Sequence, residues 1–210
     1  MKIPDFIDRF AWPGRAALTA GMVAMLALAA LHGAMRAWRP EARRDEAMLA
    51  YVRGVLGSHS TGLGAAEENA LARFIIDESE VSKIDPLFVL ALMKTESGFY
   101  NRSKSSKGAV GLMQLLPSTG EEVAGRLRLR WRGTDTLLDP YVNVKMGVYY
   151  FTSLKRRYNQ DTRITLAAYN AGPTNISGRI RSGEDIGAGF ADRVFKHYNE
   201  LKEGAEGYKK

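Results

Sequence analysis

The sequence predicts an all-α fold, and three stretches with helix start and stop signals carry that prediction. Near the middle of the chain, Asp85 is a good N-cap and Pro86 suits the first helical position, before apolar residues at helical spacing. A second helix is expected from Pro117 and the capping pattern STGE at residues 118–121. A third helix should end in the sequence NAGP at residues 170–173, because Asn, Gly and Pro terminate helices.

Glu96 lies at the end of the first of these helices. Phe88, Leu92 and Glu96 stand four residues apart, so the carboxyl shares a helix face with large apolar side chains. Burial raises the pKa of such a carboxyl, and the negative end of the helix dipole acts in the same direction, since Ser97 and Gly98 stop the helix. A carboxyl that stays protonated near neutral pH can give its proton to a glycosidic oxygen. The alternative is an amphipathic helix with a solvated glutamate at its end.

A glycine-spaced turn and an apolar run follow. Gly108 and Gly111 bracket a segment where backbone can approach a ligand closely. Gln114 sits inside the apolar run, where its amide is either tied to backbone as core structure or aimed into a cleft to bind polar substrate groups. Tyr169 and Asn170, at the end of the third helix, place a phenol and an amide where they could face a pocket.

Four motifs in this order resemble those of a known family. They are E-S at residues 96–97, G-A-x-G-L-M-Q at 108–114, D-P-x-x-N at 139–143 and A-A-Y-N-A-G-P at 167–173. Together they resemble the catalytic domain of soluble-lytic-transglycosylase-type muramidases, a group that is similar to goose-type lysozyme. The resemblance implies a lysozyme-like helical domain with a substrate cleft. It also implies a peptidoglycan lytic transglycosylase that cleaves the MurNAc-GlcNAc β-1,4 bond and leaves 1,6-anhydro-muramoyl ends.

The resemblance also implies roles for single residues. Glu96 matches the family's one catalytic acid/base, and Asn143 of the D-P-x-x-N motif is interpreted as mainly structural. Ser97 follows the acid as the family pattern expects, with plain helix termination as the alternative role. The substrate-binding positions that the resemblance implies are Ser97, Met113, Gln114, Tyr169 and Asn170.

No second acid lies near Glu96 in the sequence, although most glycosidases use a pair of carboxylates. The resemblance implies that the substrate supplies the missing groups: an N-acetyl oxygen stabilises the oxocarbenium ion and a sugar C6 hydroxyl attacks it. Two alternatives stay open at this point. One is a hydrolytic muramidase on the same fold, and the other is an envelope scaffold that binds glycan with little catalysis.

One stretch departs from the family pattern. Many members carry E-T-x-x-Y-V before the last helix, whereas residues 186–191 here read IGAGFA, with Phe190 in place of the tyrosine. The nearest acids, Glu184 and Asp185, are offset from the family position. The acid/base is unaffected, but substrate contacts by these two family side chains are not expected here.

Composition narrows the chemistry further. The chain has 210 residues, 45% of them hydrophobic, enough for one globular domain and an appendage. With no cysteine, disulfides, a thiolate nucleophile and a lipid-modified cysteine are excluded. The three histidines are scattered and no calcium-loop pattern is present, so no metal and no cofactor is expected.

The N-terminal part predicts a membrane segment. No charged residue occurs from Ala16 to Met35, a length that can cross the roughly 30 Å of bilayer hydrocarbon. An uncleaved signal anchor is favoured over cleavage near Ala29. Basic residues flank both ends, so only the expected substrate orients the chain, with the catalytic part in the periplasm and a single pass through the bacterial inner membrane. Small residues four apart leave a protein partner in the envelope open.

These patterns divide the chain into four parts. Residues 36–65 hold an amphipathic helix and a flexible glycine- and serine-rich joint, which together read as a linker. The expected parts are a cytoplasmic segment at 1–15, a transmembrane signal anchor at 16–35, the linker at 36–65 and the catalytic domain at 66–205.

The net charge of +7 is concentrated most densely at residues 126–132, where arginine alternates with Leu and Trp. At most a short β element is expected there, with a solvated arginine side and a buried apolar side. The alternative is attraction to anionic wall polymer or lipid headgroups. No nucleic-acid partner is expected, because no nucleic-acid-binding motif accompanies the cluster. The expected partners are peptidoglycan glycan strands and, through residues 16–35, the cytoplasmic membrane.

Overall fold

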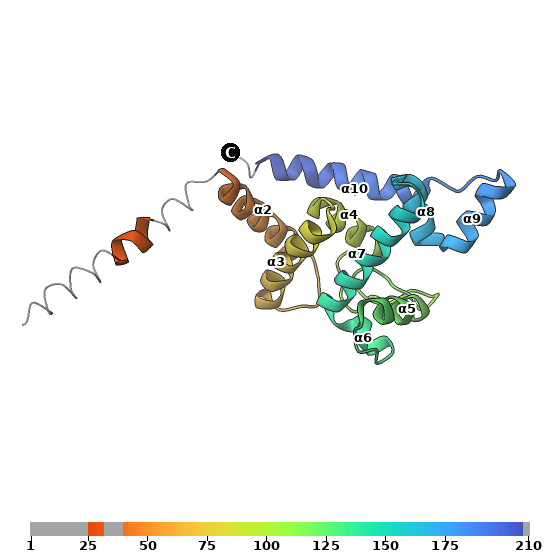
Figure 1. The fold of residues 1–210 in the computed structure, drawn as a ribbon, viewed down its shortest axis with the longest axis horizontal. Coiled ribbons are helices and arrows are strands. Elements are labelled where there is room, and N and C mark those ends of the chain that lie inside the picture. Colours follow the sequence, from red (N-terminus) through yellow and green to blue (C-terminus); the bar gives the residue numbers. More distant parts are fainter. Residues whose placement is uncertain (1–24, 32–39, 208–210) are drawn as a thin grey trace, which may run out of the picture. The chain divides into compact units, whose positions relative to one another are not determined.

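The computed structural model describes residues 25–31 and 40–207 (Figure 1). The chain divides into two compact units, residues 1–46 and residues 47–210. The long connection between α4 and α5, residues 98–116, is the largest loop within residues 40–207. The helices are α2 (Pro40–Gly57), α3 (Ala65–Ser82), α4 (Pro86–Ser97), α5 (Pro117–Leu127), α6 (Thr134–Leu138), α7 (Pro140–Arg157), α8 (Thr162–Ala171), α9 (Pro173–Ser182) and α10 (Gly189–Glu206).

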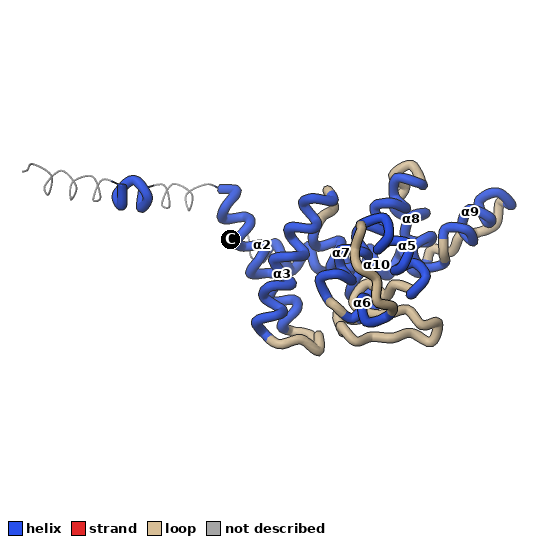
Figure 2. Tube along the Cα trace, turned by 60° about the horizontal axis from the view of Figure 1, so that its bottom comes forward, coloured by secondary structure: helices blue, strands red, loops and turns tan. Residues whose placement is uncertain are grey.

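The predicted all-α fold is confirmed. The described residues form helices and loops and no strand (Figure 2). Isolated antiparallel bridges within the long loop join Val110 to Lys104 on one side and to Leu115 on the other. The short β element allowed near residues 126–131 does not form, because α5 continues to Leu127 and Arg128 then takes a left-handed backbone with φ of 54°.

Helix α4 forms the centre of the second unit. Its start matches the sequence signals, since the Asp85 side chain accepts a hydrogen bond of 2.8 Å from the Leu87 N–H and Pro86 follows. Its end is set by Gly98, whose φ of 58° suits glycine. Between these caps, residues 87–93 are all buried, so α4 is covered on every side over two turns.

Helix α10 packs along α4 and fixes it from the C-terminal side (Figure 1). The Tyr198 hydroxyl donates a 2.6 Å hydrogen bond to Oδ2 of Asp85, the same carboxylate that caps α4. The Phe88 ring lies 5.6 Å from the Tyr198 ring and 5.3 Å from the Phe151 ring, measured between centroids. These contacts hold α4, and with it the backbone of Glu96, between α10 and α7.

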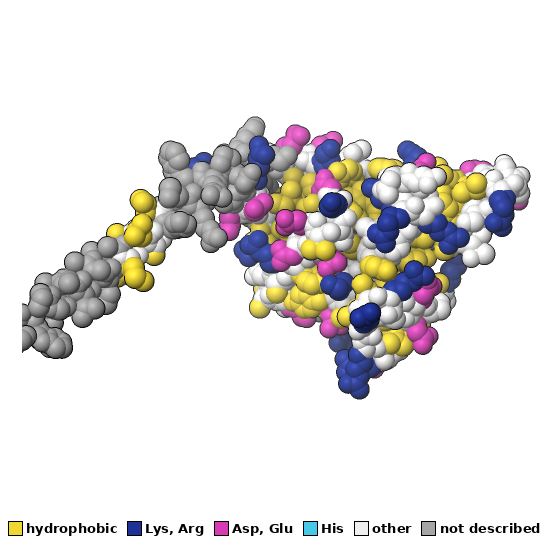
Figure 3. All heavy atoms as spheres, in the orientation of Figure 1, with side chains coloured by type: hydrophobic (Ala, Val, Ile, Leu, Met, Phe, Trp, Pro, Cys, Tyr) yellow, Lys and Arg dark blue, Asp and Glu magenta, His cyan; other side chains and the backbone are white. Residues whose placement is uncertain are grey.

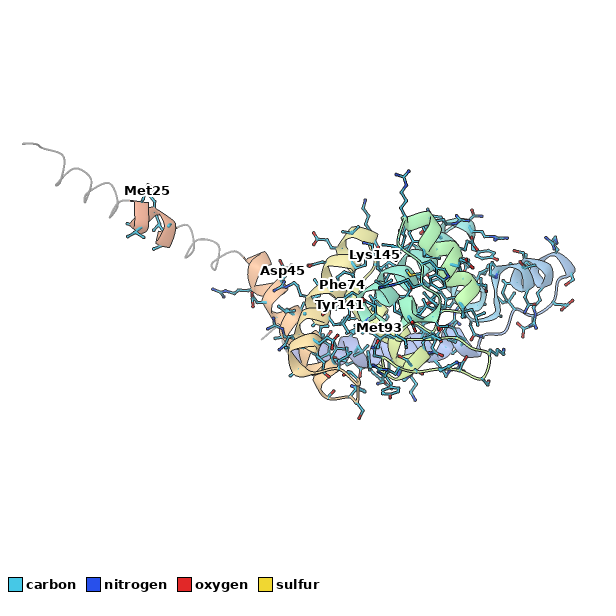
Figure 4. The ribbon with its side chains drawn as sticks, turned by 90° about the horizontal axis from the view of Figure 1, so that it is seen from below. Met25, Asp45, Phe74, Met93, Tyr141 and Lys145 are labelled. Atoms are coloured by element: carbon cyan, nitrogen blue, oxygen red, sulfur yellow. The ribbon has the colours of Figure 1, made fainter. Side chains whose placement is uncertain are left out.

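Helices α3 and α7 pack against each other on another side of α4. The Phe74 ring of α3 meets the Tyr141 ring of α7 edge to face at 5.4 Å (Figure 4). Further along the same pair, Lys145 Nζ lies 3.4 Å from Glu78 Oε2. The position of α7 matters for function because its inner face holds the long loop, as described below.

Helix α2 contributes to the same hydrophobic core. Leu49, Val52 and Leu56 are 0–1% exposed and belong to the core cluster that contains α4. Residues 47–57 therefore pack as part of the second unit. The sequence patterns place this helix in a linker that precedes a catalytic domain at 66–205, and that functional boundary stays a prediction.

Little of the predicted membrane segment falls within the described residues. Residues 25–31 are helical, and their large apolar side chains are exposed. In the part of the chain that the structure describes, no helix combines the length and apolar character needed to cross a bilayer. The rest of the predicted span at 16–35 and the whole segment at 1–15 lie outside the described residues.

The arginine-rich stretch after α5 has two distinct sides. Its arginines are exposed, and Arg126 pairs with Glu122 at 2.8 Å. Its apolar residues pack against the core, and Trp131 lies directly on Gly120 of α5. Figure 3 shows Lys and Arg side chains at the lower edge of the molecule, near α6. The arrangement is a solvated basic edge over a half-buried Leu/Trp side.

Candidate active site

A cleft of about 580 Å³ opens where α4, the long loop and the α8–α9 corner meet. Glu96 reaches it from the last turn of α4, and Tyr150 reaches it from α7. The long loop and the start of α5 form one wall, and the end of α8 with the start of α9 forms the other. The lining residues are Glu96, Ser105, Ser106, Lys107, Ala109, Gln114, Leu115, Leu116, Thr119, Tyr150, Tyr169, Asn170, Ala171, Gly172, Pro173 and Asn175.

Glu96 is the one acidic residue among the described lining residues. Burial raises the pKa of its carboxyl to about 8, and the Arg193 guanidinium lowers it by a smaller amount. The side chain is only partly buried, so the carboxyl is both shielded by apolar neighbours and open to the cleft. At neutral pH the carboxyl is therefore mostly protonated and can donate a proton to a ligand.

Asn143 of α7 fixes the backbone of the long loop. Its side chain is fully buried; Oδ1 accepts a 2.7 Å hydrogen bond from the Met113 N–H. Its Nδ2 donates to the carbonyls of Val110 at 3.0 Å and Leu137 at 2.9 Å. Gly111, with φ of 85°, leaves no room for a Cβ beside this amide. Gly111 and the buried Asn143 amide together determine the conformation of the loop.

Gln114 combines the two roles that the sequence left open. Its Nε2 donates to the carbonyls of Ser103 at 3.0 Å and Gly111 at 2.9 Å, which ties the amide to backbone. The residue also lines the cleft, and its backbone takes the left-handed region with φ of 47°. With both amide protons bound to backbone, Oε1 is the atom that remains to accept a hydrogen bond from a ligand.

Tyr169 connects α8 to the long loop behind Glu96. Its hydroxyl donates a 2.8 Å hydrogen bond to the Met113 carbonyl, and its ring lines the cleft. Burial raises the pKa of Tyr169 well above its ordinary value, and the Glu96 carboxyl adds to this effect. The phenol is thus neutral, and its proton is already bound to the loop.

Ser97 and Met113 lie beside the cleft and do not line it. The Ser97 hydroxyl bonds the carbonyls of Leu112 at 2.8 Å and Met93 at 3.1 Å, so it fastens the end of α4 to the loop. Met113 is fully buried against Gly147 of α7. The structure therefore brings Glu96, Gln114, Tyr169 and Asn170 together at the cleft, with the other two predicted residues supporting them from behind.

Three further lining residues carry no motif. Tyr150 packs its ring 5.4 Å from the Tyr169 ring, and it lies seven residues after Asn143 on the same face of α7. That spacing is the sequence signal that could have indicated it. Lys107 and Asn175 lie on opposite walls, one in the long loop and one in α9. Nothing in the local sequence distinguishes these two from ordinary surface residues.

The acids of the segment that departs from the family pattern form local hydrogen bonds and do not line the cleft. Glu184 accepts a 2.8 Å hydrogen bond from the Ser182 hydroxyl, and Asp185 accepts one of 3.0 Å from the Gly187 N–H. Phe190 is buried, with the Arg193 guanidinium 5.7 Å above its ring. None of these residues lines the cleft. In the described part of the chain, no group of His, Cys, Asp and Glu side chains could hold a metal ion.

Residues 73–187 match the family model described as Transglycosylase SLT domain. The chain is 32% identical over 112 residues to the soluble lytic murein transglycosylase of Salmonella typhimurium. The aligned segment covers 53% of this chain and 17% of that protein. It is 30% identical over 139 residues to the membrane-bound lytic murein transglycosylase C of Histophilus somni, covering 60% of this chain and 35% of that protein.

The chain thus spans a minor part of the length of these relatives. Among solved structures, the lytic transglycosylase Slt of Pseudomonas aeruginosa aligns with a TM-score of 0.49 and 22% identity, over 65% of this chain and 23% of that chain.

Proposed function

The chain belongs to the transglycosylase SLT domain family, and from this premise we propose that it is a lytic transglycosylase that cleaves the glycan strands of peptidoglycan. The relatives are named lytic murein transglycosylases, which supports murein as the substrate. The observation that carries the proposal is the Glu96 carboxyl, whose pKa burial raises to about 8, in a cleft whose other described lining residues are uncharged apart from Lys107. Such a lining suits a chain of neutral amino sugars.

The reaction begins with Glu96 as an acid. Its proton passes to the oxygen of the MurNAc-GlcNAc β-1,4 bond as the bond from that oxygen to C1 of the muramoyl residue breaks. With no second carboxylate in the described lining, the N-acetyl oxygen of the substrate stabilises the oxocarbenium ion. Because only the protonated form can start the reaction, the rate falls as the pH rises through the pKa of about 8.

Glu96 then acts as a base. The carboxylate takes the proton of the C6 hydroxyl as that oxygen bonds to C1, which closes a 1,6-anhydro ring and restores the acid without consuming water. Tyr169 holds the loop through Met113 and keeps its ring beside the carboxyl. Gln114 Oε1 and the exposed amide of Asn170 bind sugar hydroxyl or acetamido groups.

Replacement of Glu96 by Gln tests this proposal on purified sacculi. The amide keeps the shape but cannot exchange the proton, so release of soluble muropeptides should fall by about 100-fold or more. Glu121→Gln, an exposed glutamate of α5 outside the cleft lining, is the matched control and should retain activity. Full activity in Glu96→Gln would remove Glu96 from the mechanism.

Mass analysis of the products separates the alternatives. An anhydro product is one water lighter than the product of a hydrolytic muramidase on the same fold. Binding of sacculi by the wild type without release of any fragment would instead support a glycan-binding scaffold. Wild type and Glu96→Gln are digested side by side so that each product is assigned to the same carboxyl.

The proposed substrate lies outside the cytoplasmic membrane, so the proposal includes a periplasmic catalytic unit with residues 16–35 as a single-pass anchor. The uncharged sequence from Ala16 to Met35 supports the anchor, as does the membrane-bound relative from Histophilus somni.

A further inference from the structure

Lys107 places a positive charge in the lining of the cleft, and no ion pair with it occurs among the described residues. It lies at the tip of a tight turn in the long loop and is exposed. The turn is closed by hydrogen bonds of 3.0 Å from the Gly108 N–H to the Ser105 carbonyl and from the Ser105 N–H to the Ala109 carbonyl. The Ser105 hydroxyl accepts a further 3.0 Å bond from the Ala109 N–H. Hydrogen bonds therefore fix the backbone that carries Lys107, and the residue lines the cleft.

Three arginines near the cleft form contacts within the protein. Arg157 donates to the Ser177 hydroxyl at 3.4 Å, and Arg193 lies over the Phe190 ring. Arg179 donates to Asn175 Oδ1 at 3.2 Å and to the Asp185 carbonyl at 3.1 Å. Lys107 is the one cationic side chain among the described lining residues, and it forms no ion pair among the residues that the structure describes.

Two arginines add positive charge close to side chains that line the cleft. Arg193 lowers the pKa of Glu96 and Arg157 lowers that of Tyr150, so both guanidinium groups act on lining side chains, although burial outweighs them in each case. The Glu96 carboxyl is itself mostly neutral near pH 7. Glu122, which acts on Tyr150 in the opposite direction, is paired with Arg126 at 2.8 Å. Positive charge in a cleft raises the local concentration of anionic ligands.

The N-acetylated sugars of the glycan backbone carry no charge and cannot use this positive charge. The anionic groups of such a strand are carboxylates on the muramoyl side chain, either the free lactyl carboxylate or those of a peptide attached to it. We infer that Lys107 binds a carboxylate on the muramoyl side chain and so makes the cleft selective for carboxylate-bearing glycan. The inference rests on the proposed function and adds the substrate class.

Lys107→Gln tests this inference in the full chain, because the amide keeps polarity and most of the length but loses the charge. The substrates are intact sacculi, sacculi whose carboxylates have been amidated, and peptide-stripped glycan with free lactyl carboxylates. On intact sacculi the variant should lose about tenfold in kcat/KM, mainly through KM, as expected for a lost charge-assisted contact of about 1.4 kcal/mol. On amidated sacculi the wild type should fall to the level of the variant.

Two further variants serve as controls for the charge and for its position. Lys107→Arg keeps the charge and should retain the preference for carboxylates. Lys104→Gln removes an exposed charge from the same loop but outside the cleft lining, and its preference should match that of the wild type. Melting temperatures of all variants establish that the loop change does not unfold the protein.

The outcomes are distinguishable from failure of the proposed function. If the wild type cleaves intact and amidated sacculi equally well, or if Lys107→Gln keeps the wild-type preference, the inference is wrong while the cleavage activity stands. If no glycan is cleaved at all, the proposed function itself fails. A preference that persists on peptide-stripped glycan identifies the lactyl carboxylate, and one that requires the peptide identifies the stem; either result supports the inference.

Discussion

At the residue scale, Glu96 is a carboxyl that the fold holds in its neutral form. Its pKa is about 8 in the folded protein, whereas an exposed glutamate has a value near 4.5. Between these two values the folded chain keeps a proton that the unfolded chain releases, so stability falls as the pH rises from about 4.5 to about 8. The group proposed to donate the proton is therefore a source of instability at the pH where it works.

Glu96→Gln should accordingly stabilise the protein at pH 8. The uncharged amide has no proton to lose on unfolding, and the gain is expected to be about 2 kcal/mol, allowing for partial solvent access. At pH 4, where glutamate is protonated in both states, the variant and the wild type should be similar. Urea denaturation at the two pH values measures the difference.

Glu121→Gln serves here as well, since an exposed glutamate should change stability little at either pH. An equal effect of Glu96→Gln at pH 4 and pH 8 would contradict the raised pKa as its cause.

At the scale of single elements, α7 determines the shape of the cleft's long loop. Asn143 satisfies one N–H and two carbonyl groups of buried backbone, from three different residues. Gly147, one turn later, lets Met113 approach, and Tyr150 reaches the cleft itself. A single helix face thus carries a backbone clamp, a packing site and a lining side chain.

Asn143→Ala should destabilise the protein by about 4 kcal/mol, because it strands several buried polar groups at once. Urea unfolding measures this cost. Activity on sacculi should also fall, since the loop that carries Gln114 and Lys107 loses its clamp. Asn175→Ala, an exposed asparagine in α9, is the comparison and should cost less than 1 kcal/mol. A cost below 1 kcal/mol for Asn143→Ala would mean that the loop is held by other contacts.

The helix boundaries around the cleft could be predicted from sequence because their signals are local. Asp85, Pro86 and Gly98 cap α4 as expected, and α8 ends before Gly172 and Pro173. The pattern at residues 118–121 predicted a side-chain cap that does not form, since α5 begins at Pro117 with Leu116 at the N-cap position and no capping side chain. Proline at the first helical position sufficed to start that helix.

The assembly of the cleft depends on contacts between residues far apart in sequence. Local sequence patterns do not predict such contacts. The bond from Tyr169 to Met113 spans 56 residues, and the link from Tyr198 to Asp85 spans 113. Lys107 and Asn175 belong to no local motif. They line the same cleft only because folding brings its two walls together. The resemblance to a family indicated Gln114 and Tyr169, but their hydrogen-bond partners became known only from the structure.

At the scale of the whole molecule, the second unit includes a helix that the sequence patterns place in a linker. Leu49, Val52 and Leu56 of α2 are fully buried in the common core. After α2, the Thr61 carbonyl accepts a 2.8 Å hydrogen bond from the Asn101 N–H, at the start of the long loop. Residues 47–65 therefore support the same loop that lines the cleft.

A chain of residues 66–210 should be much less stable than a chain of residues 47–210. Burial of each of the three aliphatic side chains contributes about 2 kcal/mol, and the sum approaches the total stability of a small domain. Thermal unfolding followed by circular dichroism compares the two chains. Equal melting temperatures would show that α2 is dispensable.

Membrane fractionation tests the proposed anchor. The full chain is compared with the two shortened chains, and only the full chain should sediment with membranes.

Trp131 is the single tryptophan of residues 47–210. Its ring rests on Gly120, next to Thr119 of the cleft wall. A shortened chain therefore has a built-in fluorophore at one known place. Changes in its emission on addition of saccharide report on that wall alone, and a titration can follow occupancy without a dye, a label or turnover.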